Sequence, residues 1–103
     1  MQSLPMIPAS CALDEGELQR QLGRYRVAGR GAQVTERTAR RLVLDLAADV
    51  PDSEVQELVA VERGCCPFFG LDWDPEARRL AIGVLASDDE PALAAVAAAL
   101  GLA

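Results

Sequence analysis

Hydrophobic residues recur at helical spacing in the first part of the chain. They are Leu13, Leu18, Leu22 and Tyr25. This spacing predicts a helix that begins near Ser10, because serine is a favoured residue at helix N-termini. Glycine readily adopts the left-handed conformation that follows many helices, so we expect this helix to stop at residues 29–31.

Apolar and polar residues then alternate, as they do in half-buried strands, in two pairs of segments. Residues 33–36 and 42–46 make the first pair, which we expect to form a hairpin through residues 37–40. Residues 69–73 and 80–84 make the second pair, with a turn between them that contains Asp74 and Pro75. Each pair therefore predicts a β-hairpin.

A helix start signal follows each hairpin. Ser53 and Gln56 lie in capping-box register, and Ser87 and Glu90 repeat this register near the C-terminus. The first signal precedes an apolar stripe that extends to about Gly64, and the second precedes an alanine-rich stripe. We therefore predict one helix after each hairpin.

The predicted order of elements is α-ββ-α-ββ-α. Sequential antiparallel hairpins with interspersed helices are typical of an α+β fold, here a small antiparallel sheet with the helices packed on one face. The chain has 103 residues, of which half are apolar, and this is the size and composition of one domain. We expect a single domain over residues 1–103, in which residues 1–10 form an extended N-terminal arm.

Charge and hydropathy limit the expected partners and compartment. The net charge of −6 would repel nucleic acid, and the densest basic cluster, Arg37, Arg40 and Arg41, is predicted to be a solvated strand edge or turn. No run of about 18 apolar residues is present, so we expect no membrane-spanning segment. The first residues also lack the pattern of a secretory signal. These features favour the cytoplasm, where cysteines remain thiols or metal ligands.

The chain contains no histidine, which is the commonest metal ligand and the ordinary general base at neutral pH. Cysteine–histidine pairs, serine triads and histidine metal sites are therefore excluded, and we assign no catalytic residue. The candidate ligands are Cys11, before the first helix, and Cys65 and Cys66, at the exit of the second. Thiolates favour Cu(I), Hg(II), As(III) or Zn(II). Glu62 precedes the pair on the same helix face and is the candidate fourth ligand.

A longer motif surrounds the cysteine pair. Residues 62–69 read E-R-G-C-C-P-F-F, and residues 11–13 upstream read C-A-L. This pattern resembles a group of small bacterial proteins that have an E-R-x-C-C-P-F motif and an upstream C-x-L cysteine. The resemblance extends over nearly the whole chain, although G-L-D at residues 70–72 replaces a more apolar or basic run. It implies that Cys11, Cys65, Cys66 and Glu62 belong to one site, and it implies no particular activity.

Three hypotheses of function follow. The first is a cytoplasmic soft-metal or metalloid binding protein for sensing, sequestration or handover, with Zn, Cu(I) or Hg(II) as its ion. The second is a thiol/redox enzyme in which Cys65 or Cys66 is the reactive thiolate and Cys11 the resolving thiol. The third is an interaction or dimerisation module, such as a homodimer, whose cysteines are merely buried. We prefer the first, which is not an enzyme.

Overall fold

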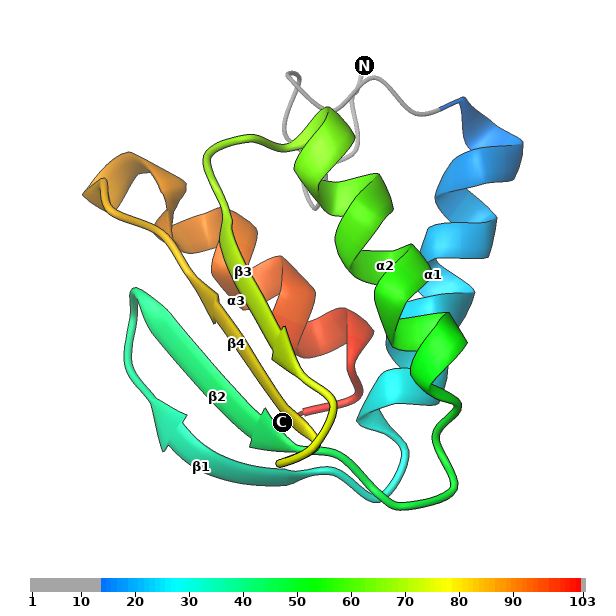
Figure 1. Cartoon of the computed structure of the whole chain (residues 1–103). Coiled ribbons are helices and arrows are strands. Elements are labelled where there is room, and N and C mark those ends of the chain that lie inside the picture. Colours follow the sequence, from blue (N-terminus) through cyan, green and yellow to red (C-terminus); the bar gives the residue numbers. More distant parts are fainter. Residues whose placement is uncertain (1–13, 103) are drawn as a thin grey trace.

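A computed structural model describes residues 14–102 as a four-stranded antiparallel sheet with three helices on one face (Figure 1). In chain order the elements are α1 (Glu15–Gly29), β1 (Gln33–Arg37), β2 (Arg41–Asp45), α2 (Asp52–Cys65), β3 (Gly70–Asp74), β4 (Arg79–Gly83), the 3-10 turn η1 (Ser87–Asp89) and α3 (Glu90–Ala99). This confirms the predicted α+β class and the order α-ββ-α-ββ-α. The predicted N-terminal arm lies outside the described residues.

The sheet has the strand order β1-β2-β4-β3, so the two hairpins meet along β2 and β4. Alternate residues of these central strands point toward the helices, and the largest fully buried side chains are Leu42, Leu44, Leu58, Leu80, Ile82 and Val55. Full burial of one such side chain contributes about 1.5 to 3 kcal/mol. The core therefore lies between the centre of the sheet and the helix layer.

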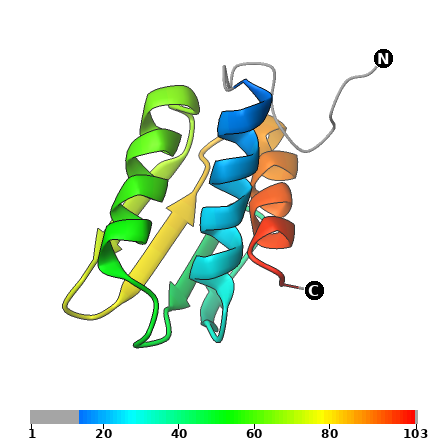
Figure 2. The same cartoon turned by 90° about the vertical axis from the view of Figure 1, so that its right-hand side faces the viewer.

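The three helices stand next to one another on this face, with α1 between α2 and α3 (Figure 2). Gly29 makes the approach of α1 to α3 possible, since a Cβ at this position would come within 1.9 Å of the Leu100 carbonyl oxygen. Gly31, in the following turn, has a φ of 71°, as expected for a glycine after a helix. No helix within residues 14–102 has the length and apolar character needed to cross a membrane.

The start of α1 differs from the prediction. The helix begins at Glu15, and the Asp14 carboxylate caps it by accepting a hydrogen bond of 2.8 Å from the Glu17 backbone N–H. Ser10, the predicted cap, lies outside the described residues. Leu18 and Leu22 are only half-buried, and the buried face of α1 consists of Gln21, Tyr25 and Ala28.

Both predicted capping boxes are wrong. Pro51 precedes α2, so Ser53 lies inside the helix, and Gln56 donates a hydrogen bond to the Asp52 side chain instead. Proline sets a backbone angle suited to a helix start, and the cap at Pro51 lies two positions before the predicted cap Ser53. Before α3, Ser87 begins η1, and the carboxylate of Glu90 forms an ion pair of 2.8 Å with Arg40.

The basic cluster at the turn of the first hairpin is solvated, as predicted. Arg37, Arg40 and Arg41 are all exposed. Arg40 pairs with Glu90, and Arg41 pairs with Glu36 at 3.3 Å. Exposed pairs of this kind contribute little to stability, about 0 to 1 kcal/mol.

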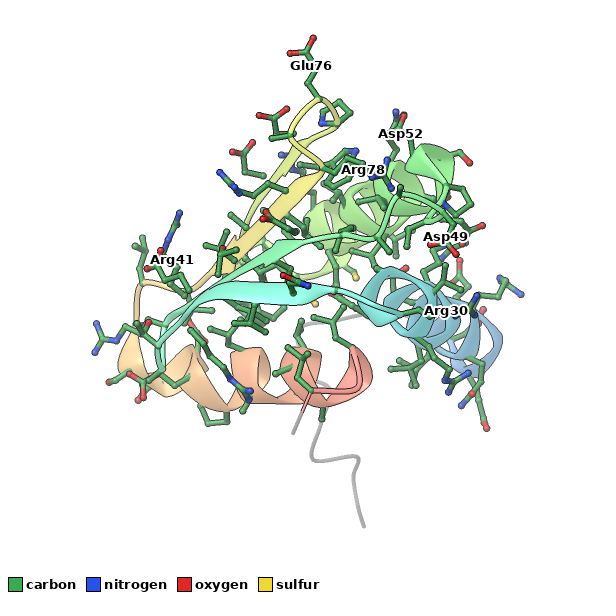
Figure 3. All side chains as sticks on the ribbon, turned by 90° about the horizontal axis from the view of Figure 1, so that it is seen from below. Arg30, Arg41, Asp49, Asp52, Glu76 and Arg78 are labelled. Atoms are coloured by element: carbon green, nitrogen blue, oxygen red, sulfur yellow. The ribbon has the colours of Figure 1, made fainter. Side chains whose placement is uncertain are left out.

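The start of α2 is attached to the second hairpin. The Trp73 indole N–H donates a hydrogen bond of 2.6 Å to the Asp52 carboxylate, and the guanidinium of Arg78 lies 5.7 Å from the centre of the Trp73 ring. Asp52 and Arg78 accordingly lie at the same end of the molecule (Figure 3). Because these contacts hold the start of α2 near the end of β3, the last turn of α2 lies near the other end of this strand, where β3 begins.

Candidate metal centre

The cysteine pair lies where α2 stops. Cys65 is the last residue of the helix, and Cys66 follows as its cap, as predicted from Pro67. The backbone N–H of Cys66 donates to the Glu62 carbonyl at 2.7 Å, and the Cys66 carbonyl accepts from Phe69 N–H at 3.1 Å. These bonds fix the turn, and they leave the two Sγ atoms 3.8 Å apart.

Glu62 joins the two cysteines in one cluster. A carboxylate oxygen of Glu62 and the sulfurs of Cys65 and Cys66 all lie within 4.8 Å of one another. Glu62 and Cys66 are buried, with exposed fractions of 6% and 2%, and Cys65 is half-buried. The structure thus brings together three of the four predicted ligands. The fourth, Cys11, lies outside the described residues.

Helix α1 contributes polar side chains to the same cluster. The Tyr25 hydroxyl donates a hydrogen bond to Oε2 of Glu62, and both groups are buried. Gln21, one turn earlier on α1, is also buried; its amide donates to the Leu58 carbonyl at 2.9 Å and accepts from Arg24. These contacts connect the middle of α1 to the last two turns of α2.

Tyr25 and Gln21 contact this cluster but were not predicted to belong to it. Tyr25 is part of the predicted apolar stripe of the first helix, and it does pack in the core. Gln21 lies three residues after Leu18 and four before Tyr25, so it occupies the same helix face. A glutamine in an apolar stripe was the available signal, because buried amides require hydrogen-bond partners.

The environment of Glu62 opposes its ionisation. Burial raises the pKa of Glu62, and the hydrogen bond from Tyr25 together with the nearby Gln21 amide only partly offsets this effect. Within residues 14–102 no arginine forms an ion pair with this carboxylate. A buried carboxylate is normally paired with a cation or coordinated to a metal, so this position favours the approach of a cation.

The thiol of Cys65 is also held in its protonated form. Burial raises the pKa of Cys65, and the nearby carboxylate of Glu62 raises it further. The C-terminal end of a helix carries a partial negative charge, which acts in the same direction. A bound metal ion would instead favour the ionised forms, since its positive charge stabilises both the thiolate of Cys65 and the carboxylate of Glu62.

The two cysteines differ in oxidation state. Cys65 is a free thiol, whereas Cys66 is disulfide-bonded. Reduction of this disulfide is therefore required before both sulfurs can bind one ion as thiolates.

The other residues of the E-R-G-C-C-P-F-F motif hold the end of α2 in place. The guanidinium of Arg63 donates to the Leu71 carbonyl of β3 at 2.7 Å. Phe69 is buried in the core, and its ring lies 4.7 Å from that of Phe68. The motif thus combines three candidate ligands with the contacts that fix them against the sheet.

Comparison of the chain with protein-family models, with curated proteins and with solved structures finds no match. The fold and the cluster therefore define the chain only as a small α+β protein with two sulfurs and a carboxylate gathered at the end of one helix.

Proposed function

We propose that the reduced protein binds a soft metal or metalloid ion through Glu62, Cys65 and Cys66, and that it acts in sensing, sequestration or handover of that ion. The observation that carries this proposal is the convergence of the three ligand atoms within 4.8 Å. Sulfur ligands select thiophilic ions over Mg²⁺ or Ca²⁺. Cys11 remains a predicted further ligand.

Two electrostatic features support a cation at this position. The buried carboxylate of Glu62 receives a hydrogen bond from neutral Tyr25 but no ion pair within the described part of the chain. The cluster also lies at the C-terminal end of α2, where the helix dipole favours positive charge. Both features disfavour an anionic ligand.

The partial exposure of the cluster is consistent with exchange of the ion. Cys65 is half-buried, while Glu62 and Cys66 are covered. A thiol of a donor or acceptor protein could reach an ion on the side of Cys65. Transfer through an exposed ligand fits handover or sequestration better than a fully enclosed structural site.

A competition titration tests the proposal. The protein, reduced with a phosphine and kept without oxygen, is titrated with Zn(II) in the presence of a chromophoric chelator. We expect one ion per chain and at least about a tenfold loss of affinity in both Cys65→Ser and Glu62→Gln. Glu57→Gln is the matched control, because Glu57 is exposed on the same helix. Wild-type affinity in Cys65→Ser, or no uptake of Zn(II), Cu(I) or Hg(II) by the wild type, would contradict the proposal.

One observation supports a second candidate function, a thiol/redox role, namely the disulfide of Cys66 beside the free thiol of Cys65. The raised pKa of Cys65 argues against it, because a reactive cysteine requires a stabilised thiolate. The pH dependence of iodoacetamide labelling separates the two roles. Half-labelling of Cys65 well below pH 8.5, about the ordinary thiol value, would favour the redox role.

A further inference from the structure

The spacing of the two sulfurs, which the structure shows with Cys66 disulfide-bonded, suits one kind of ion. Metal–sulfur bonds at zinc sites are about 2.3 Å long. Two such bonds that span the 3.8 Å between the Sγ atoms of Cys65 and Cys66 enclose an angle of about 110°. This is the angle of a tetrahedral site.

Linear coordination requires a wider spacing. Two-coordinate Cu(I) and Hg(II) place their sulfurs on opposite sides of the ion, which at about 2.3 Å per bond puts them about 4.6 Å apart. Cys65 and Cys66 are neighbours at a helix end, and Cys66 is hydrogen-bonded through both its N–H and its carbonyl. The observed spacing of 3.8 Å is shorter than that of a linear site by about 0.8 Å, so it fits a tetrahedral ion better than a linear one.

The third ligand atom, a carboxylate oxygen of Glu62, also favours an ion with tetrahedral coordination over Cu(I). A carboxylate oxygen is a usual ligand of Zn(II), with a bond of about 2.0 to 2.2 Å, and is a poor ligand for Cu(I). The Tyr25 hydroxyl donates a hydrogen bond to Oε2 of Glu62, and a carboxylate oxygen of Glu62 lies within 4.8 Å of both sulfurs. A metal ligand oriented by an outer hydrogen bond is a common arrangement in zinc sites.

We propose that the resident ion is a borderline divalent metal of the zinc class, four-coordinate, with two thiolates from Cys65 and Cys66 and one oxygen from Glu62. This inference rests on the proposed function and names its substrate class. A dithiol or phosphine first reduces the Cys66 disulfide with two electrons and two protons. The two cysteine thiols then release one proton each as the ion binds. The fourth position takes water or the predicted ligand Cys11.

X-ray absorption at the zinc edge, on the reduced protein loaded with one equivalent of Zn(II), tests this inference. We expect four scatterers that include at least two sulfurs at about 2.3 Å and at least one oxygen at about 2.0 to 2.2 Å. In Glu62→Gln we expect at least about a tenfold loss of Zn(II) affinity. Glu57→Gln should retain both the wild-type affinity and the wild-type spectrum.

Co(II) provides a second readout of coordination number. The wild type should show the intense visible absorption of tetrahedral Co(II), together with a thiolate charge-transfer band that is lost in Cys65→Ser. If Cu(I) or Hg(II) binds between two sulfurs alone while Zn(II) and Co(II) do not bind, the zinc-class inference is wrong and the proposed function survives. If none of these ions binds, both are wrong.

Discussion

At the scale of single residues, Glu62 is the group whose environment is most unfavourable to its own charge. It is buried near the end of α2, its pKa is raised, and its closest polar partner is the neutral hydroxyl of Tyr25. This arrangement is costly for the metal-free protein in its ionised form, because a buried charge lacks the hydration that it would have in water. An ion that binds there removes the cost.

Replacement of Tyr25 by phenylalanine tests the hydrogen bond to Glu62. The variant keeps the aromatic ring in the core and leaves a buried carboxyl oxygen without its donor. We expect the free energy of unfolding to fall by about 1 to 3 kcal/mol. In the Glu62→Leu background the same replacement should cost less, because no oxygen is left unsatisfied. Equal costs in the two backgrounds, measured by urea unfolding, would contradict the assigned bond.

The raised pKa of Glu62 predicts a pH dependence of stability for the reduced, metal-free protein. The folded state holds this proton more tightly than the unfolded state. The resulting stabilisation is complete below the ordinary pKa of glutamate and is lost as the pH rises through the raised value. As the pH increases above about 4, the free energy of unfolding of Glu62→Gln should therefore rise relative to that of the wild type. Glu57→Gln should follow the wild type at every pH, and a parallel course for Glu62→Gln would argue against a shifted pKa.

At the scale of elements, α1 depends on close contacts with both neighbouring helices. Tyr25 and Gln21 attach it to α2, and Gly29 lets its last turn approach Leu100 at the end of α3. The side of α1 that faces α2 contacts the cluster of Glu62, Cys65 and Cys66 through Tyr25. Substitutions in the cluster and substitutions at Gly29 should therefore both change the stability of α1.

A pair of glycine replacements in α1 tests its approach to α3. At Gly23 a Cβ would meet nothing within 4 Å, whereas at Gly29 it would lie 1.9 Å from the Leu100 carbonyl oxygen. Gly23→Ala should raise the free energy of unfolding by about 0.5 to 1 kcal/mol, since alanine favours the helix. Gly29→Ala should lower it by about 1 to 3 kcal/mol, since overpacking forces the backbone to move. Thermal or urea unfolding of the two variants measures both, and stabilisation by Gly29→Ala would refute the close contact.

Metal binding should also slow hydrogen exchange in α1. Zn(II) at Glu62 would stabilise the contact with Tyr25, and local opening of α1 would then break a stronger network. We expect amide exchange mass spectrometry to show slower exchange in α1 than in the second hairpin, β3–β4, when the ion is added to the reduced protein. Equal slowing in both segments, or none in α1, would show that α1 is not coupled to the site.

The elements differ in how far the sequence predicts them. The alternation of apolar and polar residues predicts both hairpins, and the steric restriction before Pro67 predicts the end of α2. Both signals are local in the sequence. The capping boxes at Ser53 and Ser87 were wrong because Pro51 precedes α2, and because η1, which begins at Ser87, precedes the first turn of α3, which contains Pro91. A capping signal covers only a few residues, and here the neighbouring prolines favour other helix starts.

At the scale of the whole molecule, the site was predicted in part. Glu62, Cys65 and Cys66 are close in sequence, so helical spacing is enough to group them. The contributions of Tyr25 and Gln21 depend on how α1 packs on α2, which residue spacing alone does not determine. The membership of Cys11 and the homodimer remain predictions. Sedimentation of the reduced protein would test the homodimer.

Native mass spectrometry of the reduced protein with one equivalent of Zn(II) directly tests whether the cysteine pair binds a metal ion, because it counts ions on a folded chain. We expect one zinc ion per chain for the wild type and for Glu57→Gln, and none for Cys65→Ser or Cys66→Ser variants that keep the wild-type circular dichroism spectrum. Equal zinc uptake by Cys66→Ser and the wild type would contradict a site built on the cysteine pair.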